Sequence, residues 1–152
     1  MSDISIQGQP GRRVATFTLA FYWLALITAT HWPLEFLPRD KPLLASDKLL
    51  HFSAYAGLAF LLSLVVYLRR REAASSLGLS FGTTACVWLM VVASGLCDES
   101  TQPLVGRDFE WYDWLADSVG ALCGLALCAV FVWWLSGHGL PTENRQVVGE
   151  DA

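Results

Sequence analysis

Four long apolar runs dominate the pattern of hydrophobic and polar positions along this chain. They cover Val14 to Trp32, Leu49 to Leu68, Leu77 to Cys97 and Leu115 to Leu135. Each run is close to the roughly 20 residues that an α-helix needs to cross the hydrocarbon core of a bilayer. All six prolines lie outside the runs, as expected if the runs are helices and the prolines lie in the connections. The pattern therefore predicts an all-α fold, a bundle of four transmembrane helices.

The composition supports a membrane protein over a soluble one. Hydrophobic residues make up 54% of the chain and charged residues only 16%, against about a quarter charged in ordinary soluble domains. A soluble helical bundle would need a polar face on every helix. The third run offers only small hydroxyl side chains such as Ser80, Thr83 and Ser94, which can bond to their own helix or to a neighbour.

The apolar runs also divide the chain. We expect residues 14–135 to form the membrane domain, residues 1–13 a disordered cytoplasmic tail and residues 136–152 a flexible cytoplasmic tail. A cleaved signal peptide is the alternative for the first run. That run is long, carries Tyr22 and Trp23, and ends without a small-residue cleavage site, so a retained helix fits better.

The orientation follows from the lysines and arginines in the connections. The two tails and the second connection hold Arg12, Arg13, Arg69, Arg70, Arg71 and Arg145. The first and third connections and the start of the second helix hold Arg39, Lys41, Lys48 and Arg107. The three consecutive arginines predict that both termini are cytoplasmic.

In this orientation the outer face is acidic. It receives nine of the fourteen acidic residues: Glu35, Asp40, Asp47, Asp98, Glu99, Asp108, Glu110, Asp113 and Asp117. No basic stripe suggests a nucleic acid as partner. The four cysteines lie within the predicted spans without a CxxC spacing, so neither a disulfide framework nor a zinc site is expected.

The start of the second helix carries polar groups at helical spacing. Asp47, His51 and Tyr55 recur every four residues and share one helix face, with Lys48 on much the same side. Asp47 is suited to the N-cap. An ionisable residue such as His51, one turn inside a membrane span, needs a hydrogen-bond partner and indicates a functional site.

A second polar group follows the third apolar run. Asp98 and Gln102 lie one turn apart with Glu99 beside them, and Arg107 offers a planar fork to carboxylate or phosphate. In the fourth helix, Asp113, Asp117, Gly120 and Gly124 fall along one stripe. The Gly-x-x-x-Gly spacing lets another helix approach closely, in this chain or in a second copy, and it should turn Asp117 into the bundle.

Two signatures within this order resemble the VanZ-like family of small bacterial membrane proteins. One is Asp47-Lys48-x-x-His51-Phe52-x-x-Tyr55, and the other begins with Asp98-Glu99-x-x-Gln102 and continues through Gly106-Arg107, Asp113 and Gly120. The likeness covers residues 14–135. The chain departs from the family at Asp117, where the family usually has asparagine. The resemblance implies a multi-pass protein of the bacterial inner membrane, with a named relative associated with resistance to teicoplanin-type glycopeptide antibiotics, and it carries no established reaction.

The leading hypothesis is a binding or accessory protein of the cell envelope with one polar pocket at the outer leaflet. Ten residues are candidates to line it: Asp47, Lys48, His51, Tyr55, Asp98, Glu99, Gln102, Arg107, Asp113 and Asp117. We expect the bilayer as surroundings, and a lipid-linked envelope intermediate or a glycopeptide headgroup as partner, with a homo-oligomer left open. No cofactor and no metal are predicted, because the site has one histidine and no HExxH-like spacing.

Two alternatives stay open. The first is a membrane-embedded hydrolase or transferase that acts on an envelope lipid by acid/base or metal-assisted chemistry, since carboxylates beside a histidine suit proton transfer. The second is that the polar residues only hold the helices together.

Overall fold

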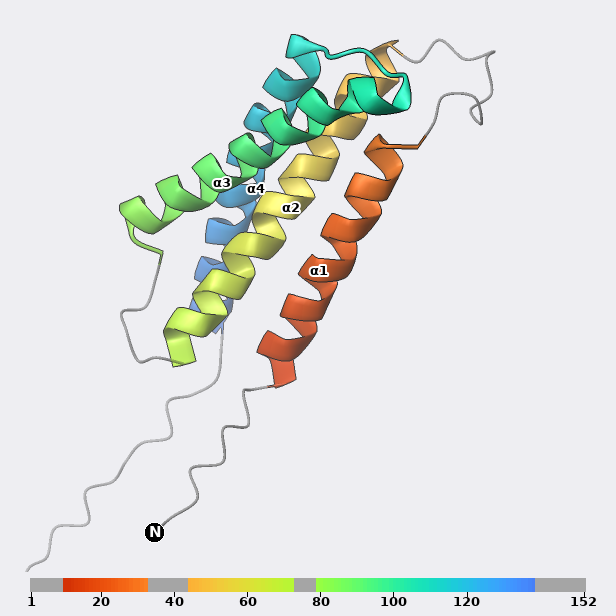
Figure 1. Cartoon of the computed structure of the whole chain (residues 1–152). Helices are drawn as coiled ribbons and strands as arrows, with labels where there is room; N and C mark the ends of the chain where they lie inside the picture. Colours follow the sequence, from red (N-terminus) through yellow and green to blue (C-terminus); the bar gives the residue numbers. More distant parts are fainter. Residues whose placement is uncertain (1–9, 33–43, 73–78, 139–152) are drawn as a thin grey trace, which may run out of the picture.

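The computed structural model describes residues 10–32, 44–72 and 79–138, which form four long helices and one short 3-10 helix (Figure 1). The long helices are α1 (Pro10–Thr30), α2 (Leu44–Glu72), α3 (Phe81–Thr101) and α4 (Trp111–His138), and the 3-10 helix η2 spans Gln102–Val105. No strand occurs within these ranges, so the predicted all-α fold is confirmed.

Each long helix includes a segment long and apolar enough to cross a membrane. These segments are Pro10–Thr30, Asp47–Arg71, Phe81–Val105 and Trp111–Ser136. Large apolar side chains point away from the bundle, and both Phe17 and Phe21 on α1 are 76% exposed. Contiguous apolar surface of this kind suits contact with lipid and not with water. The four predicted spans are therefore present in the fold.

The helices extend beyond the apolar runs at several ends. α1 begins at Pro10, so residues 10–13 are helical and not part of the predicted tail. Proline suits this first position because its missing N–H would have no partner inside the helix there. α2 begins at Leu44, so Asp47 lies in the first turn and is not the N-cap that the sequence suggested. Its carboxylate still complements the positive end of the helix dipole.

The later helix ends show why hydropathy alone misplaced the boundaries. The predicted start of the third helix, Leu77, lies outside the described residues. Leu79 and Ser80 are not helical, and Ser80 Oγ accepts a hydrogen bond from the Thr83 backbone N–H to cap α3. α4 runs to His138, so residues 136–138 are helical although the sequence placed them in the C-terminal tail. A hydropathy pattern marks the apolar part of a helix, whereas caps decide where the helix begins and ends.

A tight turn connects α3 to α4. α3 passes into η2, and Gly106 ends η2 in the left-handed conformation, with a φ of 76°. Its N–H bonds to the carbonyl of Pro103, and the N–H of Arg107 bonds to the carbonyl of Gln102. Glycine adopts this φ without strain from a side chain. The turn brings the end of α3 close to the start of α4.

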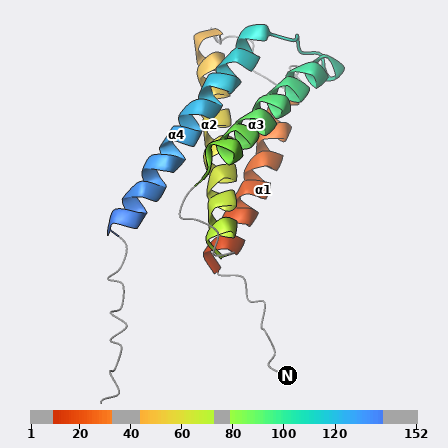
Figure 2. The same cartoon turned by 90° about the vertical axis from the view of Figure 1, so that its left-hand side faces the viewer.

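α2 is the central helix and contacts each of the other three long helices (Figures 1 and 2). The contact with α4 is close because Gly120 and Gly124 face α2. A β-carbon added at Gly120 would collide with the backbone carbonyl of Phe52, and one added at Gly124 would collide with that of Ala56. The Gly-x-x-x-Gly stripe thus packs against a helix of the same chain.

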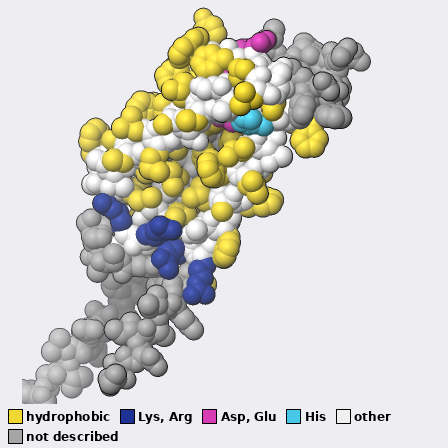
Figure 3. Space-filling model, in the orientation of Figure 1, with side chains coloured by type: hydrophobic (Ala, Val, Ile, Leu, Met, Phe, Trp, Pro, Cys, Tyr) yellow, Lys and Arg dark blue, Asp and Glu magenta, His cyan; other side chains and the backbone are white. Residues whose placement is uncertain are grey.

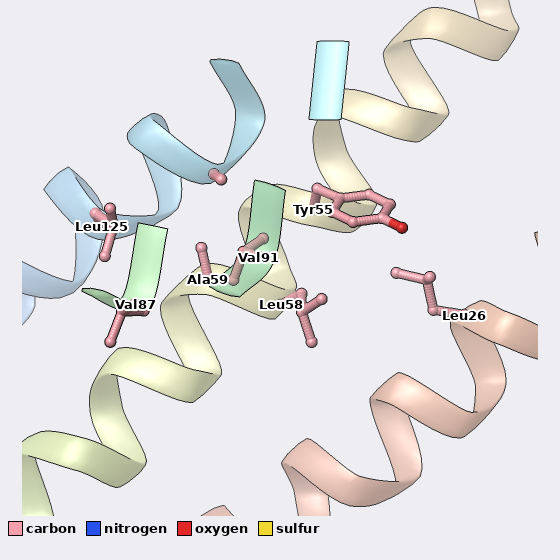
Figure 4. Close-up of a cluster of buried hydrophobic side chains, with 8 residues drawn as sticks. Leu26, Tyr55, Leu58, Ala59, Val87, Val91 and Leu125 are labelled. Carbon is pink, nitrogen blue, oxygen red and sulfur yellow. The ribbon is translucent and has the colours of Figure 1, made fainter. Parts of the chain in front are cut away.

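The middle of the bundle is apolar (Figure 4). The buried cluster consists of Leu26, Tyr55, Leu58, Ala59, Val87, Val91, Ala121 and Leu125, which come from all four long helices. Toward the end where α2 begins, the buried side chains become polar. At the opposite end, where α1 begins and α2 ends, arginines gather on the surface (Figure 3). The two ends of the bundle therefore differ in charge.

Candidate functional site

Six buried polar side chains gather where α2 begins, α3 ends and α4 begins. We call them the polar cluster: His51, Asp98, Glu99, Gln102, Asp113 and Asp117. Glu99 and Asp117 have no exposed surface at all. Burying carboxylates costs free energy unless hydrogen bonds or opposite charges compensate. The contacts of each group therefore show how the cluster is held.

His51 lies at the centre of the polar cluster. Its Nδ1 is 3.0 Å from Asp117 Oδ1 and donates a hydrogen bond to it. The same nitrogen is 3.8 Å from Glu99 Oε1, and the opposite nitrogen, Nε2, is 4.0 Å from Asp113 Oδ2. One imidazole on α2 thus faces carboxylates from both α3 and α4.

Glu99 is held by two hydrogen bonds. Gln102 Nε2 donates to Glu99 Oε1 at 2.8 Å, and the backbone N–H of Glu110 donates to Glu99 Oε2 at 3.2 Å. The second bond reaches across the α3–α4 connection. Because both carboxylate oxygens have a donor, the side chain is oriented toward His51 and the connection is tied to α3.

Lys48 lies one turn before His51 and compensates the acids on the α4 side. Its Nζ donates to Asp113 Oδ1 at 2.5 Å and to Glu110 Oε2 at 3.0 Å. Asp113 is buried, whereas the Glu110 side chain is 42% exposed. The ammonium therefore compensates a buried carboxylate first and a surface carboxylate second.

Asp98 is held by the end of α1. Thr30 Oγ1 donates to Asp98 Oδ1 at 2.8 Å, and His31 Nδ1 lies 3.4 Å from the same oxygen. His31 Nε2 is also 2.9 Å from Thr101 Oγ1. These contacts connect α1 to the polar cluster.

The sequence did not indicate Thr30, His31 or Glu110 as site residues. His31 carried a usable signal, because it is an ionisable residue at the end of a predicted span, as His51 is at the start of another. Thr30 and Glu110 carried none, since threonine is common in membrane helices and Glu110 lies among other acids of the same connection.

Several buried polar atoms lack a hydrogen bond within the part of the chain that the structure describes. Three of them are Tyr55 Oη, Asp98 Oδ2 and Asp117 Oδ2. Each belongs to a residue that the sequence analysis placed in the site. Buried polar atoms of this kind are uncommon and call for a physical explanation.

All ten predicted site residues lie at this end of the bundle, but they do not all contact one another. Asp47 is half-buried, and its carboxylate lies within 4.8 Å of donor atoms on His51 and Asp113. Arg107 is half-buried beside the polar cluster, and its side chain forms no ion pair with a described residue. Tyr55 lies below the cluster with its ring in the apolar core.

A pocket of about 770 Å³ opens between α1, α2 and the connection before α4. One wall is largely apolar and is formed by Ala25, Leu26, Ala29, Leu50 and Ala54, with Tyr22 among them. The other end is polar and is formed by Thr30, Asp47, His51, Gln102, Arg107, Asp108, Glu110 and Asp113. The pocket thus joins a lipid-like surface to charged groups.

The polar cluster, together with Asp47, also offers two donor sets that could hold a metal ion. The donor atoms of His51, Glu99 and Asp117 all lie within 4.8 Å of one another, and all three side chains are buried. A second set, Asp47, His51 and Asp113, meets the same criterion nearer the pocket.

Comparison with known proteins places this architecture in a family. No curated protein and no solved structure matches the chain. Residues 4–132 match the VanZ/LLP1 family, which confirms the resemblance seen in the two sequence signatures. The match covers all four membrane-competent helices except the end of α4. The chain is a multi-pass membrane protein that belongs to the VanZ/LLP1 family.

Proposed function

We propose that this protein binds an amphipathic molecule of the cell envelope in the pocket beside the polar cluster. The observation that carries the proposal is the division of the pocket into an apolar wall on α1 and α2 and a charged end around Arg107 and His51. Ligand sites typically combine apolar walls with a few well-placed polar groups. A lipid-linked intermediate has this two-part chemistry, and the headgroup of a glycopeptide antibiotic would fit the charged end.

Arg107 is the group we assign to an anionic headgroup. Lys48 donates to Asp113 and Glu110, so its charge is already committed to carboxylates. Arg107 lines the pocket and has no carboxylate partner among the described residues. Its guanidinium can bind a phosphate or carboxylate through two parallel hydrogen bonds.

We place the pocket at the outer leaflet of the bacterial inner membrane, with both termini cytoplasmic. The support is the charge difference between the two ends of the bundle. The last turn of α2, far from the polar cluster, carries Arg69, Arg70 and Arg71. Lysine and arginine favour the cytoplasmic side of a membrane. The protein would then have a binding or accessory role in envelope physiology or in resistance to glycopeptide antibiotics.

A binding experiment tests this proposal. Purified protein in detergent is mixed with a polyprenyl phosphate or with phosphatidylcholine, and complexes are counted by native mass spectrometry. We expect the phosphate lipid to bind preferentially. Arg107→Gln should weaken that preference, and Ala29→Trp should block binding by filling the apolar side of the pocket.

Matched controls distinguish the pocket from the general lipid-facing surface. Arg13→Gln removes an exposed arginine at the opposite end, and Ala126→Trp adds the same bulk to an exposed position of α4 outside the pocket. Both controls should bind the phosphate lipid as the unaltered protein does. Equal loss in the pocket variants and the controls would contradict the proposal.

A second candidate function is a hydrolase or transferase that acts on an envelope lipid. It is supported by the imidazole of His51, which faces Glu99 and Asp117 as a proton-transferring group would. Release of inorganic phosphate from a polyprenyl diphosphate, and its loss in His51→Ala, would favour this function over binding alone.

A further inference from the structure

The polar cluster and its ion-pair partners carry more negative charge than their own cations can balance. Five carboxylates, on Asp98, Glu99, Glu110, Asp113 and Asp117, face one ammonium, on Lys48, and two imidazoles, on His31 and His51. With every carboxylate ionised, at least two negative charges remain even when both imidazoles are protonated. Four of the five carboxylates are buried, so this excess is costly unless a further cation or a proton neutralises it.

The uncompensated negative charge is concentrated around His51, on the side away from Lys48. Glu99 and Asp117 have no exposed surface, and among the described residues the only cationic group within ion-pair distance of either is His51. The other buried acid near them, Asp98, is held by Thr30 and His31. The place where positive charge is missing thus lies between α2, α3 and α4.

The donor geometry at this place fits a metal ion. Two ligand atoms bound to one ion at about 2.1 Å lie roughly 3 to 3.5 Å apart. His51 Nδ1 lies 3.0 Å from Asp117 Oδ1 and 3.8 Å from Glu99 Oε1. The donor atoms of Glu99 and Asp117 lie within 4.8 Å of each other, so small side-chain movements would bring all three donors to one ion.

An unpartnered oxygen at the same place supports a ligand independently. Asp117 is fully buried, and its Oδ2 has no hydrogen bond from any described residue. A carboxylate oxygen buried without a partner is costly, and coordination of a cation by both oxygens of Asp117 would satisfy it.

The groups behind the three donors resemble the supports of known metal ligands. Gln102 and the Glu110 backbone orient Glu99 by hydrogen bonds. If Nδ1 of His51 coordinates the ion, Nε2 carries the proton and faces Asp113, which Lys48 holds in place. A carboxylate behind a metal-bound histidine is a common arrangement that fixes the ring.

We propose that His51, Glu99 and Asp117 bind a divalent transition-metal ion of the Zn²⁺ or Mn²⁺ class. One imidazole nitrogen and two carboxylate oxygens suit these ions, and none of the three donors is a thiolate that would favour Cu⁺. The site borders the pocket, because His51 lines both. The inference goes beyond the proposed lipid binding and does not depend on it, and it departs from the expectation from the sequence that no metal is bound.

Metal titration of the full chain tests the site. Protein purified in detergent and stripped with a chelator is titrated with Zn²⁺ and with Mn²⁺ by calorimetry, and bound metal is counted by elemental analysis. We expect one ion per chain. Glu99→Gln and Asp117→Asn should each weaken binding by at least about tenfold, and His51→Ala should weaken it further. The matched control is Asp108→Asn, which changes an exposed acid at the pocket edge. This variant should bind the metal as the unaltered protein does.

A measurement on the unaltered protein keeps the test decisive if a variant fails to fold. Pulsed electron paramagnetic resonance of the Mn²⁺-loaded protein should show coupling to one imidazole nitrogen. The proposal would be overturned if the folded protein bound neither ion or if that coupling were absent. It would also be overturned if the three site variants bound the metal as tightly as the unaltered protein does. Loss of metal with intact lipid binding in Asp117→Asn would separate this inference from the proposed function.

Discussion

Gly120 of α4 packs directly against the backbone carbonyl of Phe52 on α2, with no room for a β-carbon between them. One residue before Phe52 is His51, and three residues before Gly120 is Asp117. The close approach of the two backbones therefore brings the imidazole of His51 within hydrogen-bond distance of the Asp117 carboxylate. Helix packing and the polar cluster depend on the same contact.

Replacing Gly120 should destabilise the bundle. In Gly120→Ala the added methyl group must push α4 away from α2, which we expect to cost about 1 to 3 kcal/mol, as overpacking of a tight interface typically does. Thermal unfolding in detergent measures the effect. Gly82→Ala is the matched control, because a β-carbon there meets nothing within 4 Å. Equal unfolding temperatures for the two variants would contradict the direct contact between Gly120 and the Phe52 carbonyl.

The hydrogen bond between His51 and Asp117 can be separated from the charge of Asp117. Asp117→Asn keeps an oxygen that accepts from His51, so in chelator-containing buffer we expect stability at or above that of the unaltered protein. Asp117→Leu leaves the buried Nδ1 without an acceptor and should cost about 1 to 3 kcal/mol. Thermal unfolding compares the two. A loss in the asparagine variant as large as in the leucine variant would show that the charge itself is required.

Lys48 should matter because it compensates a buried carboxylate. Lys48→Met leaves Asp113 buried without its cation and should lower the free energy of unfolding by about 1 to 3 kcal/mol. The Lys48 side chain is 35% exposed, so we expect less than the loss typical of a fully buried ion pair. Adding Asp113→Asn to Lys48→Met should recover part of the loss. Glu110→Gln should have a smaller effect, since the Glu110 side chain is 42% exposed whereas Asp113 is buried. A larger effect of Glu110→Gln than of Lys48→Met would refute this assignment.

The proposed orientation predicts the location of the C-terminus. A reporter enzyme that is active only outside the cytoplasm, fused after Ala152, should be silent, and a cytoplasmic fluorescent reporter at the same position should be bright. The expectation follows from the three arginines in the last turn of α2, because arginine favours the cytoplasmic side. The last turn of α4 lies on the same side of the bundle as these arginines. Activity of the enzyme with a dark fluorescent reporter would reverse the topology and place the polar cluster at the inner leaflet.

The sequence by itself determined the four helices and the end of the bundle at which the polar residues lie. Apolar runs of membrane length can satisfy their backbone hydrogen bonds in lipid only as helices, so their number was fixed by composition. Consecutive helices then alternate in direction. It follows that one side of the membrane holds the start of α2, the end of α3 and the start of α4. His51, Glu99 and Asp117 lie on these segments and therefore on that side.

Only the tertiary structure decided which of these residues meet. Two hydrogen bonds show this: Glu99 accepts from the backbone N–H of Glu110, and Asp98 accepts from Thr30 at the end of α1. Both depend on how each helix is rotated and tilted. Neither quantity is encoded in hydropathy, because both result from side-chain packing between helices that are distant in sequence. Local hydrogen bonds set the helix ends, where the Ser80 cap and the Gly106 turn overrode the limits of the apolar runs.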